Sequence, residues 1–62
     1  MYKATVVYLV KHPDVEDWPT LQYETSAKTM DEVLKNISIY EAGLKAAGYT
    51  IVGRQFTSKY IA

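Results

Sequence analysis

The residues of this sequence with the greatest potential for chemistry lie between positions 12 and 17. His12, Asp14, Glu16 and Asp17 carry the imidazole and carboxylate groups that bind divalent cations. A metal site needs three or four ligands that converge in space, whereas these four residues belong to one short segment. The sequence therefore favours a solvated acidic loop. A hard-cation site is the minor alternative, and no metal or cofactor is predicted.

The sequence also lacks the usual parts of a covalent catalyst. Nucleophilic catalysis needs a Ser, Thr or Cys beside a base that a third group orients. His12 is the only histidine, there is no cysteine, and the three glycines lack the strand-to-helix setting of a phosphate-binding loop. The sequence predicts that the chain is not an enzyme. A small enzyme or metal-dependent regulator built on His12 is the third-ranked hypothesis.

The acidic loop and the neighbouring strands carry residue types that protein interfaces favour. Tryptophan and tyrosine are common anchors of interfaces, and long loops often carry function. The predicted partner-binding residues are three loop acids, one tryptophan, two tyrosines and one arginine: Asp14, Glu16, Asp17, Trp18, Tyr23, Arg54 and Tyr60. We expect a non-enzymatic protein-binding module whose partner is another protein or a second copy of the chain.

Nucleic acid is the second class of partner. Seven basic residues balance seven acidic ones, so the molecule lacks the large positive field of most nucleic-acid-binding proteins. Lys11, Lys28, Arg54 and Lys59 could still line a groove in which tyrosines stack on bases. The alternative function is a homodimeric nucleic-acid-binding domain in which paired sheets assemble a basic face.

Length and composition limit the architecture. A chain of 62 residues with 48% hydrophobic residues predicts a single compact domain over residues 1–62. The longest apolar run, residues 6–10, is far shorter than the roughly 20 residues of a membrane span. The first residues also lack the pattern of a signal peptide. We expect a cytoplasmic protein without a membrane partner.

The hydrophobic pattern predicts a strand over residues 2–11, a long loop over 12–19 and a second strand over 21–27. A capping box at Thr29 and Glu32 predicts the start of a helix, and Gly48 predicts its end near residue 47. A last strand follows over residues 49–60. The expected fold is α+β, with a ββαβ order, a three-stranded antiparallel sheet in the order 2-1-3 and the helix on one face.

The pattern also assigns faces. The first strand is apolar on both faces, so we expect both to be buried, the second by the loop around Trp18 or by another molecule. Phe56 and Tyr60 are expected to share a face with Val52, opposite Ile51. Gly53 indicates a bulge or a close backbone approach, and Gly43 suggests close packing of the helix. The expected helix stripe consists of Val33, Leu34, Ile37, Tyr40, Leu44 and Ala47.

Two segments, residues 26–34 and 47–51, resemble the family of small phage proteins that inhibit host RNA polymerase. The resemblance implies the same order of elements. It also implies a class of function, namely a phage-encoded accessory protein that inhibits a host protein by occupying its surface. The arginine pair on the last strand of that family corresponds here to Gly53 and Gln55, so the polymerase itself is not implied as the target. HicB-type antitoxins contain a similar passage from strand to helix.

Overall fold

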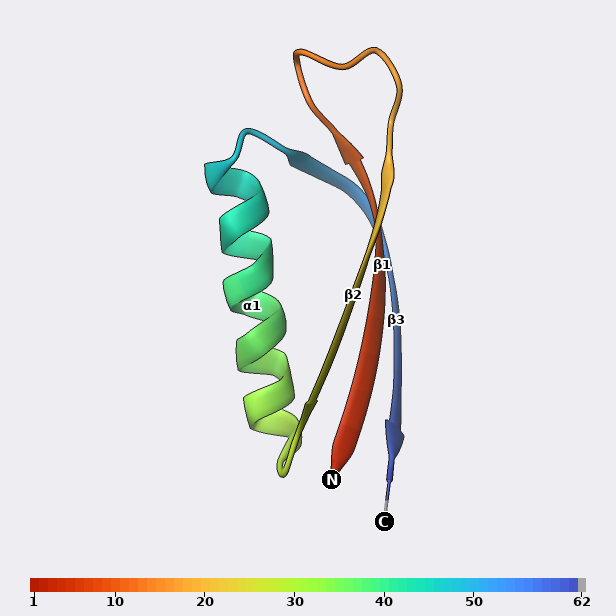
Figure 1. Ribbon diagram of the computed structural model, residues 1–62, viewed down its shortest axis with the longest axis vertical. Coiled ribbons are helices and arrows are strands. Elements are labelled where there is room, and N and C mark those ends of the chain that lie inside the picture. Colours follow the sequence, from red (N-terminus) through yellow and green to blue (C-terminus); the bar gives the residue numbers. More distant parts are fainter. Residues whose placement is uncertain (62) are drawn as a thin grey trace.

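The computed structural model describes residues 1–61 and contains three strands and one helix (Figure 1). The elements are β1 (Tyr2–Lys11), β2 (Thr20–Ala27), α1 (Met30–Ala46) and β3 (Thr50–Tyr60). The strands form one antiparallel sheet in the order β2-β1-β3, with α1 on one face. The predicted fold class and strand order are therefore confirmed.

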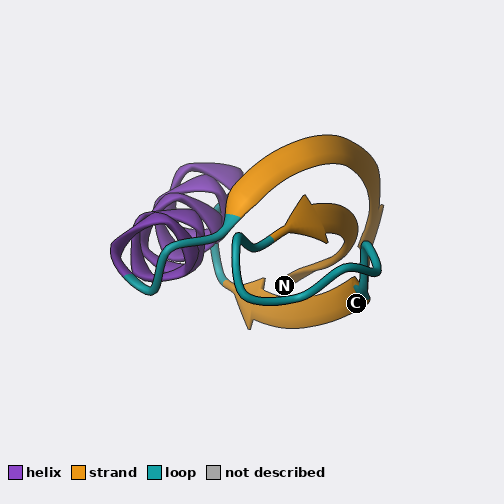
Figure 2. Ribbon diagram, turned by 90° about the horizontal axis from the view of Figure 1, so that it is seen from above, coloured by secondary structure: helices purple, strands orange, loops and turns teal. Residues whose placement is uncertain are grey.

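The core lies between the helix and the central strand. The even-numbered side chains of β1 from Ala4 to Val10 are fully buried, and they form one cluster with Val33, Ile37 and Leu44 of α1. Seen from above, the sheet is strongly curved and α1 lies against one side of it (Figure 2). The helix packs mainly over β2 and β1 and much less over β3. As a result, β3 is the least covered strand on the helix side.

The other face of β1 is less buried than the sequence suggests. Thr5 and Val7 are half-buried there, and Leu9 is exposed. The cross-strand neighbours of Val7 are Gln22 and Gln55, so the apolar strand is bordered by polar side chains. No element within residues 1–61 covers this side, so the prediction that the loop around Trp18 buries it is wrong. Burial of this face by another molecule stays a prediction.

Both ends of the helix follow the predicted local signals. Thr29 lies before the first turn, and its Oγ1 accepts a hydrogen bond from the backbone N–H of Glu32 at 3.2 Å. Gly48 has a φ of +95°, which is the left-handed conformation that allows the chain to leave a helix. The Tyr49 N–H then donates to the carbonyl of Leu44 at 3.0 Å. The chain therefore turns back toward the sheet.

A bulge at Val52 reverses the alternation of side chains along β3. Ile51 pairs with Val10, whereas Gly53 pairs with Leu9, so one extra residue lies between them. The side chains of Ile51, Phe56 and Tyr60 consequently share the helix side of the sheet. A bulge was one of the two alternatives that Gly53 indicated. The prediction that Ile51 lies opposite Phe56 and Tyr60 is wrong, because the extra residue shifts the period-two pattern.

The helix also differs from its predicted stripe. Leu34 and Ala47 are exposed, and Leu34 lies beside Phe56 near the uncovered part of β3. A Cβ atom added at Gly43 would meet no atom within 4 Å, so the predicted close packing at this residue is wrong.

In the described chain, α1 is not long and apolar enough to cross a membrane.

Candidate functional site

The loop between β1 and β2 is fastened at its base by His12. The backbone N–H of Val15 donates to the His12 carbonyl at 3.1 Å, and the N–H of Asp14 donates to His12 Nδ1 at 3.1 Å. Since Nδ1 accepts a hydrogen bond, the ring proton lies on Nε2, which donates to the carbonyl of Ala47 at 3.3 Å. The imidazole also packs edge-on against Tyr49. His12 thus connects the loop to the end of α1.

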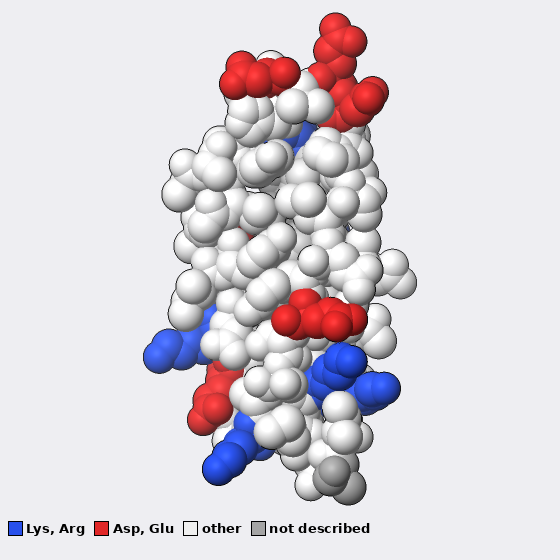
Figure 3. Space-filling view, viewed as in Figure 1, with Lys and Arg blue, Asp and Glu red and all other residues white. Residues whose placement is uncertain are grey.

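Beyond this base, the tip of the loop combines acidic and apolar side chains. Asp14, Glu16 and Asp17 are exposed, and Trp18 is 51% exposed. The space-filling view shows acidic side chains gathered at the same end of the molecule as the loop (Figure 3). Within residues 1–61, no group of three or more His, Cys, Asp or Glu side chains is arranged to hold a metal ion. The four predicted partner-binding residues of the loop, Asp14, Glu16, Asp17 and Trp18, therefore lie together at its exposed tip.

The remaining predicted site residues lie elsewhere. Tyr23 stacks on Tyr40 of α1 with a centroid distance of 4.2 Å and packs against the core, so its ring is already engaged. Tyr60 is 66% exposed and contacts Tyr2 edge-on at the end of β3, at the other end of the molecule from the loop (Figure 1). Arg54 lies in the middle of β3. The structure therefore divides the seven predicted residues among separate regions.

Arg54 belongs to a polar cluster that the sequence did not reveal. Arg54 Nη1 lies 2.7 Å from Glu41 Oε2, and the buried hydroxyl of Tyr8 donates to the same oxygen at 2.9 Å. Burial and the hydrogen bond to Glu41 raise the pKa of Tyr8 well above its usual value. Burial opposes ionisation of Glu41, but the hydrogen bonds from Arg54 and Tyr8 outweigh it and lower its pKa. Glu41 is therefore held as a carboxylate, and it accepts the hydrogen bond of the fully buried Tyr8.

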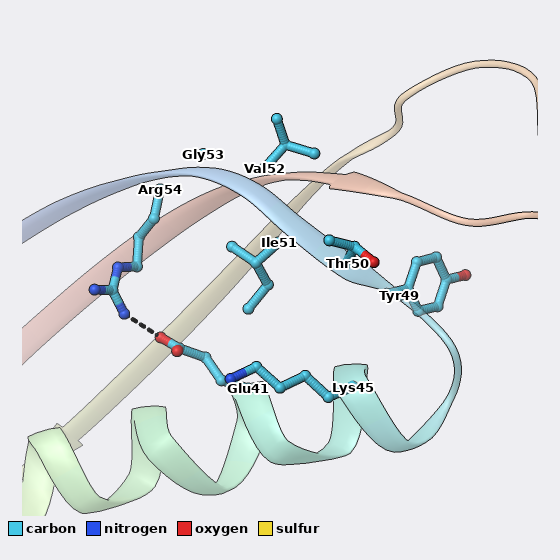
Figure 4. Close-up of a pocket in the computed structure, with 8 residues that line it drawn as sticks. All are labelled: Glu41, Lys45, Tyr49, Thr50, Ile51, Val52, Gly53 and Arg54. Carbon is cyan, nitrogen blue, oxygen red and sulfur yellow. Dashed lines mark hydrogen bonds and ion pairs between the residues drawn. The ribbon is translucent and has the colours of Figure 1, made fainter.

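This cluster crosses a groove between α1 and β3 (Figure 4). On one side of the ion pair is an open hollow of about 560 Å³ whose lining includes Lys45, Thr50 and Ile51. On the other side is a smaller hollow of about 290 Å³, lined by Leu34, Ile37, Arg54 and Phe56. Because Glu41 accepts hydrogen bonds from Tyr8 and Arg54, the cluster joins α1 to β1 and β3. The spacing of Glu41 and Lys45 on one helix face was the only sequence signal for this groove.

The sheet face away from the helix carries a small basic hollow. Lys3 and Lys59 are directly opposite each other on β1 and β3, and with Thr5 and Thr57 they line a hollow of about 290 Å³. Like charges in this arrangement repel each other, so an anionic group placed between them would be stabilised. Lys59 was among the basic residues predicted to bind nucleic acid, whereas Lys3 was not.

No family model, curated protein or solved structure matches this chain. The resemblance to phage inhibitors of host RNA polymerase therefore stays a prediction.

Proposed function

We propose that this chain is a non-enzymatic protein-binding module that docks its partner through the tip of the 12–19 loop, with Trp18 as the anchor. The observation that carries the proposal is a half-exposed tryptophan on a loop whose base is fastened by His12. Tryptophan is among the commonest energetic anchors of interfaces. A loop with a fixed base also loses less conformational entropy when it binds.

The charges around Trp18 indicate the chemistry of the partner surface. Asp14, Glu16 and Asp17 belong to the same loop as the anchor and are exposed. A complementary surface has an apolar pocket for the indole and lysine or arginine side chains at its rim. Such a mode of action fits the class that the sequence resemblance implies, an accessory protein that acts in the cytoplasm by occupying a surface of a larger host protein. The phage origin and the inhibitory effect are parts of the same proposal.

A pull-down from bacterial lysate with matched variants tests the proposal. Wild type should retain one protein at stoichiometric level, and Trp18→Ala should weaken its binding by at least about tenfold, because anchor residues contribute roughly 2 kcal/mol or more. Ile39→Ala is the control, since Ile39 is 62% exposed on α1 and away from the loop. If no protein is retained, or if both variants bind as wild type does, the proposal fails.

One observation favours nucleic acid as a second candidate partner. The opposed pair Lys3 and Lys59, with threonines beside it, is a suitable site for a phosphate group. Two of the tyrosines that could stack on bases are less available, because Tyr23 is engaged with Tyr40 and Tyr49 with His12, whereas Tyr60 is 66% exposed. A mobility-shift titration at low salt decides this point. Binding at micromolar protein that is lost in Lys59→Glu supports the second candidate, and no binding removes it.

A further inference from the structure

The outer edge of β3 is an unpaired strand edge beside an exposed apolar surface. Within residues 1–61, β3 pairs only with β1, and every residue from Arg54 to Tyr60 is exposed. Proteins protect such edges with charged side chains, above all lysine, with proline, with bulges or with a covering element. In this segment the charged residues are Arg54, which is paired with Glu41, and Lys59, and the bulge at Val52 lies before the segment. This segment has no proline, and α1 lies mainly over the other two strands. The edge is therefore open to pairing with another strand.

The hydrogen bonds at the end of the sheet identify which backbone groups are unpaired. Met1 and Ile61 exchange hydrogen bonds in both directions, which makes them a bonded pair of the antiparallel ladder. Bonded pairs alternate along such a ladder, so Lys59, Thr57 and Gln55 also bond to β1. The backbone N–H of Val10, an even-numbered residue of β1, points away from β3 and donates to the carbonyl of Pro19, as this alternation requires. The outward backbone groups of β3 are therefore those at even positions: Arg54, Phe56, Ser58 and Tyr60.

The same four residues direct their side chains toward the helix side. Their β1 partners are Tyr8, Val6, Ala4 and Tyr2, which lie on that side. Phe56 is 45% exposed there, close to Leu34, and Tyr60 is more exposed still. An additional strand at this edge would therefore continue the sheet and also extend the apolar layer under α1.

We propose that a second copy of this chain pairs antiparallel with β3 at this edge, with a two-fold axis at Thr57. Residues whose backbone groups point outward can hydrogen-bond only to residues of the second copy whose backbone groups also point outward, and these are the even-numbered ones. The numbers of two paired residues therefore add up to an even number, so the axis passes through a residue and not between two residues. The register centred on Thr57 uses the whole exposed run, since Arg54 then lies opposite Tyr60 of the second copy. The product is a six-stranded sheet in the order 2-1-3-3-1-2. An axis perpendicular to the sheet places both helices on the same face.

Charge and side-chain chemistry favour a second copy as the occupant. In this register Arg54 faces an aromatic ring and Lys59 faces Gln55 of the second copy, so no like charges are opposed. Phe56 lies opposite Ser58 and diagonal to Phe56 of the second copy, within reach of an aromatic contact. The chain has a net charge of zero and does not repel itself. The apolar strips of the two copies also meet on the same face, as the two-fold axis requires.

Sedimentation equilibrium with two serine-to-proline variants tests this interface. Wild type should form a species of twice the 7.0 kDa mass of one chain. Ser58→Pro removes an outward N–H from each copy without removing a bond to β1, and it should raise the dimer dissociation constant at least about tenfold. Ser26→Pro is the matched control. The ladder alternation also directs the N–H of Ser26 outward, but from β2, at the other edge of the sheet.

A wild-type mass of one chain up to roughly millimolar concentration overturns the proposal. Loss of the dimer in Ser26→Pro but not in Ser58→Pro also overturns it, because the other edge would then be the interface.

Hydrogen exchange of the wild type provides a test that does not depend on how the variants fold. In the dimer, the amides of Phe56 and Ser58 should exchange slowly, whereas those of Gln22 and Glu24 on the edge of β2 should exchange fast. Equal exchange at both edges contradicts the proposal. This interface is independent of the loop tip, so Trp18→Ala should leave the dimer intact.

Discussion

At the scale of single residues, the main finding is that Glu41 joins the core to the surface. Its Oε2 accepts hydrogen bonds from the buried Tyr8 hydroxyl and from the half-exposed Arg54 guanidinium. Without this acceptor, a polar hydroxyl would be buried among Val6, Val10 and the helix, at a considerable cost in free energy. The cluster thus allows a tyrosine to occupy the centre of a very small core.

The pH dependence of stability tests the role of Glu41. Its pKa is lowered in the folded protein, so its contribution to stability is present above its ordinary pKa near 4.5 and is lost as the pH falls below that value. Wild type should therefore lose stability on acidification, and Glu41→Gln should lose less. At neutral pH the variant should be less stable by about 1 kcal/mol, because the Arg54 side chain is half-exposed and the ion pair is screened.

Urea denaturation at pH 7 and near pH 3 measures this difference. Glu16→Gln removes a carboxylate from the exposed loop and is the control. If Glu41→Gln has the same acid dependence as wild type, the cluster does not contribute in the way that its geometry indicates.

At the scale of elements, the two glycines near the end of α1 have opposite roles. Gly43 has an ordinary helical conformation and open space around it, whereas Gly48 has a positive φ. A Cβ atom at Gly48 would also lie 3.1 Å from His12 Nε2, in the contact that fastens the loop. The first glycine therefore weakens the helix, and the second is required by the turn.

Alanine substitutions at these glycines should change stability in opposite directions. Gly43→Ala should stabilise the protein by about 1 kcal/mol, because alanine loses less backbone entropy in a helix. Gly48→Ala should destabilise it by a similar amount or more, because alanine is strained at positive φ. Thermal unfolding measures both effects, and 1 kcal/mol corresponds to about 4–8 °C in a domain of this size. Destabilisation by Gly43→Ala would mean that this part of α1 packs against something.

The elements also differ in how well the sequence predicted them. The ends of α1 were predicted because Thr29, Glu32 and Gly48 act through contacts within a few residues. The faces of β3 were not, because one extra residue at Val52 shifts all later side chains to the other face. The glycine at position 53 indicated a bulge but not which residue would be the extra one.

At the scale of the whole molecule, the features proposed for binding lie in separate regions. The described chain is elongated, with Cα extents of 42 × 17 × 11 Å, and the loop tip is at one end. The segment Arg54–Tyr60 forms the part of β3 that lies farther from the loop tip. A two-fold axis at Thr57 would therefore direct the two loop tips to opposite ends of the six-stranded sheet. Such a dimer presents two equivalent anchors, which increases its avidity for a repeated target.

Dimer formation should make thermal stability depend on protein concentration. Because only the folded chain forms this interface, mass action raises the unfolding temperature of wild type, by about 3–6 °C for each tenfold increase in concentration above the dissociation constant. Ser58→Pro should have a lower unfolding temperature that changes little with concentration. Differential scanning calorimetry over a dilution series makes this measurement. A wild-type unfolding temperature that is independent of concentration would contradict the dimer.

The sequence by itself determined the four elements, the strand order and the acidic loop with its tryptophan. Those features depend on local patterns, on capping and turn residues, and on the few ways in which a short chain can connect antiparallel strands. Only the tertiary structure decided that α1 leaves Arg54–Tyr60 of β3 exposed, that His12 fastens the loop and that Glu41 joins Tyr8 to Arg54. These depend on contacts between residues from 13 to 35 positions apart in the chain, which no local pattern records.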